Sequence, residues 1–382
     1  MKYGLTLEGG GARGAYHIGA VKALVENGYE FDAVVGTSIG AINAAFIAQG
    51  DVDVAYDMWH TLSFKDLFNV EEEKIQNAMN INLDINTVKY LSSKLKKVIK
   101  EKGIDTLKIR EILEEKVDEE KIRNSDIKLG LVTFCLSDKS GEELYIDDIK
   151  NGDLINYLMA SSNLPVFQRV KLNDKKYMDG GVYDNCPVNL LEKKGIKEAV
   201  VIRTYKRMRI RGYKDIVKRG NVNMHMIQPV DELTSILNFD SNNLNELLKL
   251  GYFDALKMVK SLDGIRYYLD PVPEEKMLEK LRDVDYDKIQ KIASLGSIKL
   301  DIGEYANDLL IYKIVPSLAQ KTKNKDLSGI KDYVFALLEY VALENNVEKY
   351  KIYTIDEFIK AIQSTPKKTG NKAIKEFVNS LK

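Results

Sequence analysis

Histidine, cysteine and net charge are all scarce in this sequence of 382 residues. It contains three histidines and two cysteines, and its 57 basic residues balance 57 acidic ones. Two cysteines, Cys135 and Cys186, cannot supply a disulfide framework or a cysteine-rich metal cluster, so buried free thiols in a reducing compartment are favoured over a single bridge. A formal net charge of zero gives no general reason to expect nucleic acid as a partner.

Long hydrophobic runs are absent as well. No stretch approaches the roughly 18 uncharged apolar residues that a membrane-spanning helix needs, so we expect no transmembrane segment. The first residues carry one lysine and a short apolar stretch that Glu8 interrupts, which is unlike a secretory signal. These features favour a cytoplasmic location, and any contact with a membrane would be peripheral, at its surface.

Apolar strand-like and helix-like segments alternate along the first half of the chain. The pattern predicts strands over 3–7, 31–35, 127–135 and 199–203, and helices over 15–27, 41–49 and 154–160. This alternation predicts an α/β fold with a mainly parallel central sheet that helices cover on both faces.

One region within this half has a different composition. Residues 63–124 are rich in lysine and glutamate and contain no proline, and apolar residues recur at helical spacing over 88–100 and 109–115. We expect a helical insertion that covers one edge of the core. The sequence alone does not say whether this insertion acts as a lid.

The last third of the chain is helical and rich in lysine. Segments such as 330–344 and 355–362 predict helices, and the glycine-rich turns of the first part fade after about residue 262. We therefore expect a first domain over 1–262 and a helical C-terminal domain over 263–382, whose role the sequence does not reveal.

The segment Gly36-Thr37-Ser38-Ile39-Gly40 has the G-x-S-x-G form and joins a predicted strand to a predicted helix. Such a sharp turn needs glycines because side chains there would collide, and it exposes the serine hydroxyl to substrate. The N-terminus of the following helix favours developing negative charge. An idle serine in a glycine-rich turn is the alternative, and the strand-to-helix context makes it the weaker one.

A second glycine-rich turn, Gly9–Gly14, reads Gly-Gly-Gly-Ala-Arg-Gly and lies between the first strand and the first helix. Consecutive glycines expose backbone N–H groups that can stabilise an oxyanion. Arg13 would either fix the loop or add positive charge. The glycines also fit a dinucleotide-binding fingerprint, but that fold expects an acidic residue near the end of the second strand, and Asp32 stands at its beginning.

The third motif is Asp179-Gly180-Gly181. A free aspartate, with a pKa near 3.9, is a poor base at neutral pH, and partial burial can raise that pKa to a useful range. A plain Asp-Gly turn is the common alternative. Asp184 is a second carboxylate nearby, and we interpret it as part of a turn.

The histidines do not fit a serine triad. His17 stands among apolar residues of the first helix, where a packing role is favoured, and His60 precedes the insertion. His225 alone follows Asp179 in the chain order of α/β-hydrolases, and its surroundings predict a strand rather than a loop. A two-residue site, in which the aspartate deprotonates Ser38 directly, is the simpler interpretation.

Taken together and in order, these motifs resemble the patatin-like phospholipases. The resemblance spans about residues 3–260 and rests on the glycine loop, the serine turn, the Asp-Gly-Gly turn, and the segments 160–167, 184–188 and 250–256. It implies a three-layer α/β/α fold and a Ser-Asp dyad, with Ser38 as nucleophile and Asp179 as proton acceptor. The motif glycines are Gly9, Gly14, Gly36, Gly40, Gly180 and Gly181.

The resemblance also implies an oxyanion hole formed by the amides of Gly10, Gly11 and Arg13, and an acyl-enzyme intermediate. The substrates would be fatty acyl esters of phospholipids or lysophospholipids. No metal or other cofactor is expected, because the sequence has no calcium loop or zinc-ligand spacing. The alternatives are a catalytically silent member that acts as an interaction module and, less favoured, a nucleotide-binding protein.

One further feature is a basic stretch, residues 206–219, that holds seven basic residues and one acidic residue, Asp215. Met208, Ile210 and Tyr213 are interleaved with the charges. Such a stretch could approach anionic lipid headgroups, although a solvated charged loop is the favoured interpretation.

Overall fold

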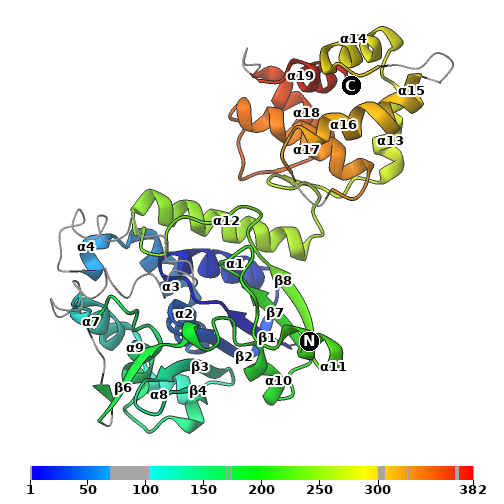
Figure 1. Ribbon diagram of the computed structural model, residues 1–382. Coiled ribbons are helices and arrows are strands. Elements are labelled where there is room, and N and C mark those ends of the chain that lie inside the picture. Colours follow the sequence, from blue (N-terminus) through cyan, green and yellow to red (C-terminus); the bar gives the residue numbers. More distant parts are fainter. Residues whose placement is uncertain are drawn as a thin grey trace. The chain divides into compact units, whose positions relative to one another are not determined.

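The described residues form two compact units, Met1–Leu256 and Lys257–Lys382 (Figure 1). The computed structural model describes residues 2–68, 103–168, 171–172, 174–299, 306–324, 327–365 and 370–381. The boundary between the units falls within helix α12 (Ser241–Val259), a few residues before the position expected from the sequence. No helix within these ranges is long and apolar enough to cross a bilayer.

An eight-stranded sheet is the centre of the first unit. Its strands are β1 (Lys2–Leu7), β2 (Glu30–Thr37), β3 (Lys128–Cys135), β4 (Ser140–Tyr145), β5 (Lys171–Leu172), β6 (Lys175–Asp179), β7 (Glu198–Ile202) and β8 (Asn223–Ile227). The order is β5-β6-β3-β2-β1-β7-β8, and β4 also pairs with β3. The pairs among β3, β2, β1, β7 and β8 are parallel, whereas β4, β5 and β6 pair antiparallel, so the predicted mainly parallel sheet is confirmed.

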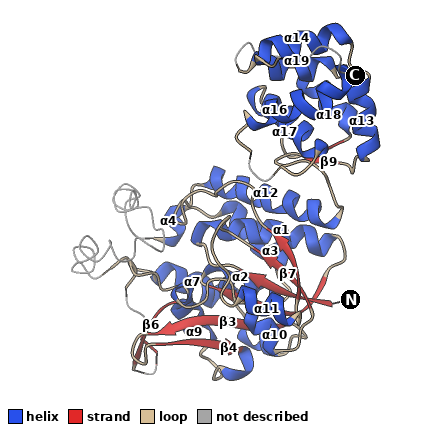
Figure 2. Ribbon diagram, turned by 45° about the vertical axis from the view of Figure 1, so that its right-hand side comes forward, coloured by secondary structure: helices blue, strands red, loops and turns tan. Residues whose placement is uncertain are grey.

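Helices cover both faces of this sheet (Figure 2). They are α1 (Gly14–Glu26), α2 (Ile39–Ala48), α3 (Val52–Thr61), α4 (Phe64–Leu67), α7 (Leu107–Lys116), α8 (Glu119–Arg123), α9 (Leu154–Ser161), α10 (Val188–Lys193), α11 (Tyr213–Arg219) and α12, with short 3-10 turns at Gly11–Arg13, Ile146–Asp148 and Gly180–Val182. Val35 packs with Leu191 of α10, whereas the next residue, Gly36, faces α2. Adjacent strand residues point to opposite faces, so α10 and α2 lie on different sides of the sheet and the three-layer fold is confirmed.

The order of the strands creates a switch point between β1 and β7. The chain passes from β1 to β2 in one direction along the sheet and from β7 to β8 in the other. In open α/β sheets, the loops that leave the carboxyl ends of the strands separate at such a point and form a crevice for ligands. The glycine-rich turn follows β1 and the basic stretch follows β7, so both begin at this edge.

The predicted insertion is helical where the structure describes it. The helices α4, α7 and α8 lie within residues 63–124, and the predicted helix over 109–115 falls inside α7. The predicted helix over 88–100 lies outside the described residues.

The second unit is helical, as expected. It contains α13 (Glu274–Arg282), α14 (Tyr286–Gly296), α15 (Ala306–Leu309), a π-helical turn (Leu310–Ile314), α16 (Val315–Gln320), α17 (Ile330–Glu344), α18 (Ile355–Ser364), α19 (Lys372–Ser380) and two short paired strands, β9 (Tyr268–Leu269) and β10 (Ile352–Tyr353). Its core is built from apolar side chains such as Phe335, Leu338, Phe358 and Phe377. The buried carboxylate of Glu339 accepts three backbone N–H groups of residues 265–267.

Candidate active site

Ser38 occupies a strained turn between β2 and α2. Its backbone angles are φ 58° and ψ −129°, a region that residues with side chains rarely adopt. A Cβ atom at Gly36 would lie 2.3 Å from the backbone of Gly40, and one at Gly40 would lie 2.3 Å from the carbonyl oxygen of Leu7. A side chain at either position would therefore clash in the tight turn that carries Ser38.

Asp179 lies directly against Ser38. The Ser38 hydroxyl donates a hydrogen bond of 2.6 Å to Oδ2 of Asp179, and the Gly181 N–H donates one of 2.8 Å to Oδ1. Burial raises the pKa of Asp179 to about 6, while these two hydrogen bonds act to lower it. A Cβ atom at Gly180 would lie 2.2 Å from the carbonyl oxygen of Val132, so the turn after Asp179 also needs a glycine.

Strand β3 brings these two residues together. Its residue Val132 pairs with Thr37, the last residue of β2, and the next residue, Thr133, pairs with Asp179, the last residue of β6. Because β4 occupies the other edge of β3, strands β2 and β6 share one edge and meet end to end. Their ends, and hence Ser38 and Asp179, are held side by side by consecutive residues of a single strand.

The C-terminal turn of α9 fixes the backbone of both residues. The hydroxyl of Ser161 accepts the Ser38 N–H at 2.9 Å and donates to the carbonyl of Val132 at 2.7 Å. The Asn163 carbonyl accepts the Asp179 N–H at 2.9 Å. The sequence pointed to the segment 160–167 through its family resemblance but assigned no role to either side chain.

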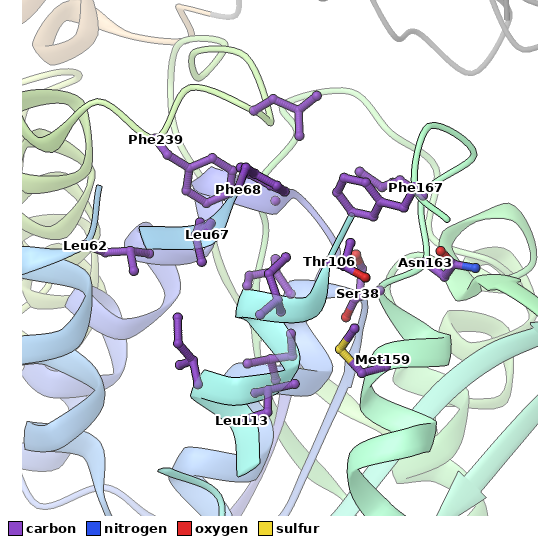
Figure 3. A pocket seen from close by; sticks show the side chains of 18 of the residues that line it. Ser38, Leu62, Leu67, Phe68, Thr106, Leu113, Met159, Asn163, Phe167 and Phe239 are labelled. Atoms are coloured by element: carbon purple, nitrogen blue, oxygen red, sulfur yellow. The ribbon is translucent and has the colours of Figure 1, made fainter. Parts of the chain in front are cut away.

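Asn163 also presents a buried polar atom to the site. Its Nδ2 donates to the carbonyl of Tyr177 at 3.0 Å, which fixes the orientation of the amide, and its Oδ1 has no hydrogen-bond partner among the residues that the structure describes. Figure 3 shows the side chain beside Ser38 at the wall of the cavity, with its nitrogen pointing away. Such an unpaired oxygen is costly unless something outside the protein, such as water, donates to it.

The glycine-rich turn supplies free amides next to Ser38. Gly11 has φ +56°, and a Cβ atom there would lie 2.1 Å from the carbonyl oxygen of Ile236, which accepts the Ala12 N–H. The Arg13 N–H donates to the Gly10 carbonyl within the turn. Among the hydrogen bonds of the described residues, none uses the amides of Gly10 and Gly11. Two of the three amides expected for an oxyanion hole are thus unengaged, whereas the third is already bonded.

The other two glycines of this turn allow close packing. A Cβ atom at Gly9 would lie 2.3 Å from Oδ1 of Asn185, and one at Gly14 would lie 2.5 Å from Cγ1 of Ile39, the residue after the nucleophile candidate. The turn is therefore pressed against both neighbouring loops of the site.

The Arg13 side chain fixes loops rather than facing the cavity. Its guanidinium donates to the carbonyls of Thr204, Leu233 and Thr234 at 2.7–3.0 Å and stacks over the Tyr205 ring at 4.4 Å. Of the two roles considered from the sequence, the structure favours the loop-fixing one. Arg13 ties the glycine turn to the segments that follow β7 and β8.

An apolar cavity opens beside Ser38. Its volume is about 90 Å³, and its wall includes few polar groups. Side chains of α2, α3, α4, α7, α9 and of the segments 162–167 and 237–239 line it. They include Ile42, Phe46, Trp59, Leu62, Leu67, Phe68, Ile109, Leu113, Met159, Phe167, Leu237 and Phe239 (Figure 3). The described ends of the insertion thus contribute to its wall.

The three histidines lie elsewhere. His17 is fully buried, burial lowers its pKa to about 3, and its Nδ1 lies 3.4 Å from the side-chain nitrogen of Asn43. His60 is exposed on α3, and His225 contacts Glu198 at the surface. None of them bonds to Ser38 or to its aspartate within the described ranges, so no triad forms there. Asp32 pairs with Lys2 at the amino-terminal ends of β1 and β2, away from the glycine-rich turn. It therefore cannot serve as the acidic residue that a dinucleotide-binding site needs near that turn.

One group of potential metal ligands lies away from Ser38. Cys135, Asp138 and Glu142 each place one ligand atom within 4.8 Å of the others. However, Asp138 forms an ion pair with Lys175 and Glu142 accepts from Tyr177, so protein partners account for both carboxylates. Both cysteines are free and buried, in agreement with the preferred interpretation of the sequence.

Comparison with known proteins matches this geometry to a family. The family model described as patatin-like phospholipase matches residues 5–191, a range that includes both Ser38 and Asp179. This part of the chain belongs to the patatin-like phospholipase family. The patatin-like region thus holds the serine turn, the glycine turn and the aspartate turn, and it ends before β7.

Curated relatives of this patatin-like chain include much longer proteins. Patatin-like phospholipase domain-containing protein ZK370.4 of Caenorhabditis elegans is 24% identical over 77% of this chain and 20% of its own length. Lysophospholipase NTE1 of Meyerozyma guilliermondii is 25% identical over 87% of this chain and 20% of its own length. Probable lipid hydrolase 463L of Invertebrate iridescent virus 6 is 23% identical over 61% of this chain and 80% of its own. The chain spans about a fifth of the first two relatives.

Proposed function

We propose that this chain is a serine acyl hydrolase that cleaves fatty acyl esters of phospholipids or lysophospholipids through a Ser38–Asp179 dyad. The observation that carries the proposal is the 2.6 Å hydrogen bond from the Ser38 hydroxyl to the Asp179 carboxylate at an apolar cavity. Acyl transfer needs a nucleophile, a base hydrogen-bonded to it and donors for the oxyanion, such as unengaged backbone amides.

In the first half of the reaction, the Asp179 carboxylate takes the proton of Ser38 Oγ as this oxygen attacks the ester carbonyl. The amides of Gly10 and Gly11 donate to the resulting oxyanion. When the tetrahedral intermediate collapses, the bond to the alcohol breaks and the leaving oxygen takes the proton from Asp179. A pKa near 6 suits this role, because the group is ionised at neutral pH and is a stronger base than an exposed aspartate.

In the second half, water attacks the carbonyl carbon of the acyl-enzyme and Asp179 takes one of its protons. The new tetrahedral intermediate expels Ser38 Oγ, which recovers the proton from Asp179, and the fatty acid leaves.

Two observations support a lipid ester as the substrate. The cavity wall is almost entirely aliphatic and aromatic, which suits a fatty acyl chain. The described residues that line it include no charged side chain that would bind a charged substrate. The names of two relatives, a lysophospholipase and a probable lipid hydrolase, agree with that class.

The main alternative is a catalytically silent protein that acts as an interaction module. A fluorophosphonate probe separates the two, because it forms a covalent bond only with an activated serine. We expect the probe to label the full chain at Ser38, and to fail with Ser38→Ala and Asp179→Asn. An unlabelled wild-type chain that is fully folded would favour the silent alternative.

Hydrolysis itself is tested with a chromogenic medium-chain ester and with a mixed lipid extract whose products are identified by mass spectrometry. We expect free fatty acid and a lysophospholipid or a glycerophosphodiester from the wild type. Ser38→Ala should release neither, and normal cleavage by this variant would overturn the proposal.

A further inference from the structure

The basic stretch after β7 lies along the loops of the proposed active site. Arg13 stacks over Tyr205, and the side-chain amide of Asn185 contacts the sulfur of Met208 at 3.2 Å. The Arg211 guanidinium lies 3.7 Å from the centre of the Tyr183 ring, four residues after Asp179. Residues 205–211 therefore follow the turn that carries the aspartate, at the same edge of the sheet as Ser38.

Most of the positive charge in this stretch is uncompensated. Of its seven basic residues, Arg211 pairs with Glu143 and Arg219 with Glu192. The other five have no ion-pair partner within the described part of the chain, and all of them are exposed: Lys206, Arg207, Arg209, Lys214 and Lys218. Since the whole chain has no net charge, this surface is a local concentration of positive charge and not part of a general excess.

Exposed apolar side chains accompany these charges. Tyr213 and Val217 are 45% and 51% exposed and lie four residues apart on α11, so they form one row along the helix. Lys214 and Lys218 form the adjacent row. Val182, in the turn after Asp179, is 49% exposed as well. Basic residues next to exposed aromatic and aliphatic ones are typical of surfaces that rest on a lipid–water interface.

We propose that this surface, residues 205–219 with Val182, docks the protein on anionic lipid headgroups so that the cavity faces its substrate. The inference rests on the proposed function, because a lipid ester must leave a bilayer or micelle to reach Ser38. The basic groups face the phosphates and acidic headgroups, and the apolar row enters the interface. Nucleic acid and acidic proteins are less suited as partners, because they offer no apolar layer for Tyr213 and Val217.

The test uses vesicle co-sedimentation with the full chain carrying Ser38→Ala, so that binding is measured without hydrolysis. Phosphatidylcholine vesicles with and without about a third of phosphatidylglycerol are compared. The variant Lys206→Gln/Arg207→Gln/Arg209→Gln removes three charges from the surface. A matched control, Lys150→Gln/Lys197→Gln/Lys249→Gln, removes three exposed lysines that lie outside it and have no ion pair among the described residues.

We expect tight binding to the anionic vesicles only, roughly 100-fold weaker binding after the surface substitutions, and little change in the control. When the same substitutions are made in a chain that keeps Ser38, both triple variants should hydrolyse a water-soluble ester at the wild-type rate. Equal loss in both triple variants, equal binding to neutral vesicles, or binding to heparin but not to vesicles would each overturn the docking surface. If the wild type binds anionic vesicles but hydrolyses no ester, the proposed activity would be refuted, whereas the docking surface would still be supported.

Discussion

The side chain of Ser161 holds the backbone of Ser38: its hydroxyl oxygen accepts the Ser38 N–H at 2.9 Å. The same hydroxyl donates to Val132, so Ser161→Ala would leave two buried backbone groups unpaired at a cost of about 1–3 kcal/mol. We expect a lower melting temperature and a lower kcat with a nearly unchanged KM, because the strained turn loses its anchor. Ser162→Ala is the control for the melting temperature, since the hydrogen bond of that hydroxyl among the described residues runs to the Leu158 carbonyl of the same helical turn. A Ser161→Ala enzyme as stable and active as the wild type would contradict this role.

The activity should depend on pH through Asp179. Only the ionised carboxylate can take the serine proton, so kcat/KM should fall about tenfold for each pH unit below about 6. Asp184→Asn is a matched control, because burial also raises the pKa of Asp184 to about 6 but its carboxylate bonds to the Cys186 N–H and not to Ser38. This variant should keep the same pH profile, and a profile that moves in Asp184→Asn would show that the wrong carboxylate was identified.

Asp179 should also lower the stability of the fold at neutral pH. Its folded-state pKa, about 6, lies above the ordinary value of 3.8, so the native state binds more protons than the unfolded state between about pH 4 and 6. The free energy of unfolding therefore falls as the pH rises through this window, by roughly 3 kcal/mol, and the loss persists above pH 6. The variant Asp179→Asn should be inactive in an ester assay. In urea unfolding, it should be more stable than the wild type at pH 7.5, and this difference should vanish near pH 4. A destabilised variant at pH 7.5 would argue against a buried, ionised base.

Gly11 and Gly28 both have positive φ angles, of +56° and +80°, but only Gly11 is crowded. A Cβ atom at Gly28 would meet nothing within 4 Å, so Gly28→Ala should cost about 1 kcal/mol and leave kcat unchanged. Gly11→Ala carries the same backbone penalty and a clash with the Ile236 carbonyl, so it should lose more stability and shift the amides away from the oxyanion. Comparing melting temperature and kcat for the two variants separates the clash from the backbone effect. Equal behaviour of both would refute a role for the Gly11 amide.

Most strands of the parallel part of the sheet could be predicted from the sequence. Strands such as β1, β2 and β7 are short apolar runs bounded by glycine or polar turns, and these local signals predict them well. Strands β5 and β6 were not predicted, because lysines at 171, 175 and 176 mask their alternation. The serine and the aspartate of the proposed dyad were identified from the glycine motifs around them, which are local signals.

The parts of the site that the sequence did not reveal depend on distant contacts. Ser161 lies 123 residues from Ser38, and Arg13 lies more than 190 residues from the carbonyls that it binds. Nothing in a serine or an arginine alone indicates which backbone group it will meet after folding. The choice between a loop-fixing and a charged role for Arg13 therefore needed the tertiary structure.

The end-to-end meeting of β2 and β6 on β3 has a consequence for the newly made chain. Ser38 leaves the ribosome 141 residues before Asp179, so a nascent protein has its nucleophile but lacks the group that activates it. Only when the late hairpin adds to the growing sheet, with Asp179 opposite Thr133, does the pair assemble. In the proposed mechanism, a chain that has not yet paired β6 with β3 therefore holds its serine without the carboxylate that activates it.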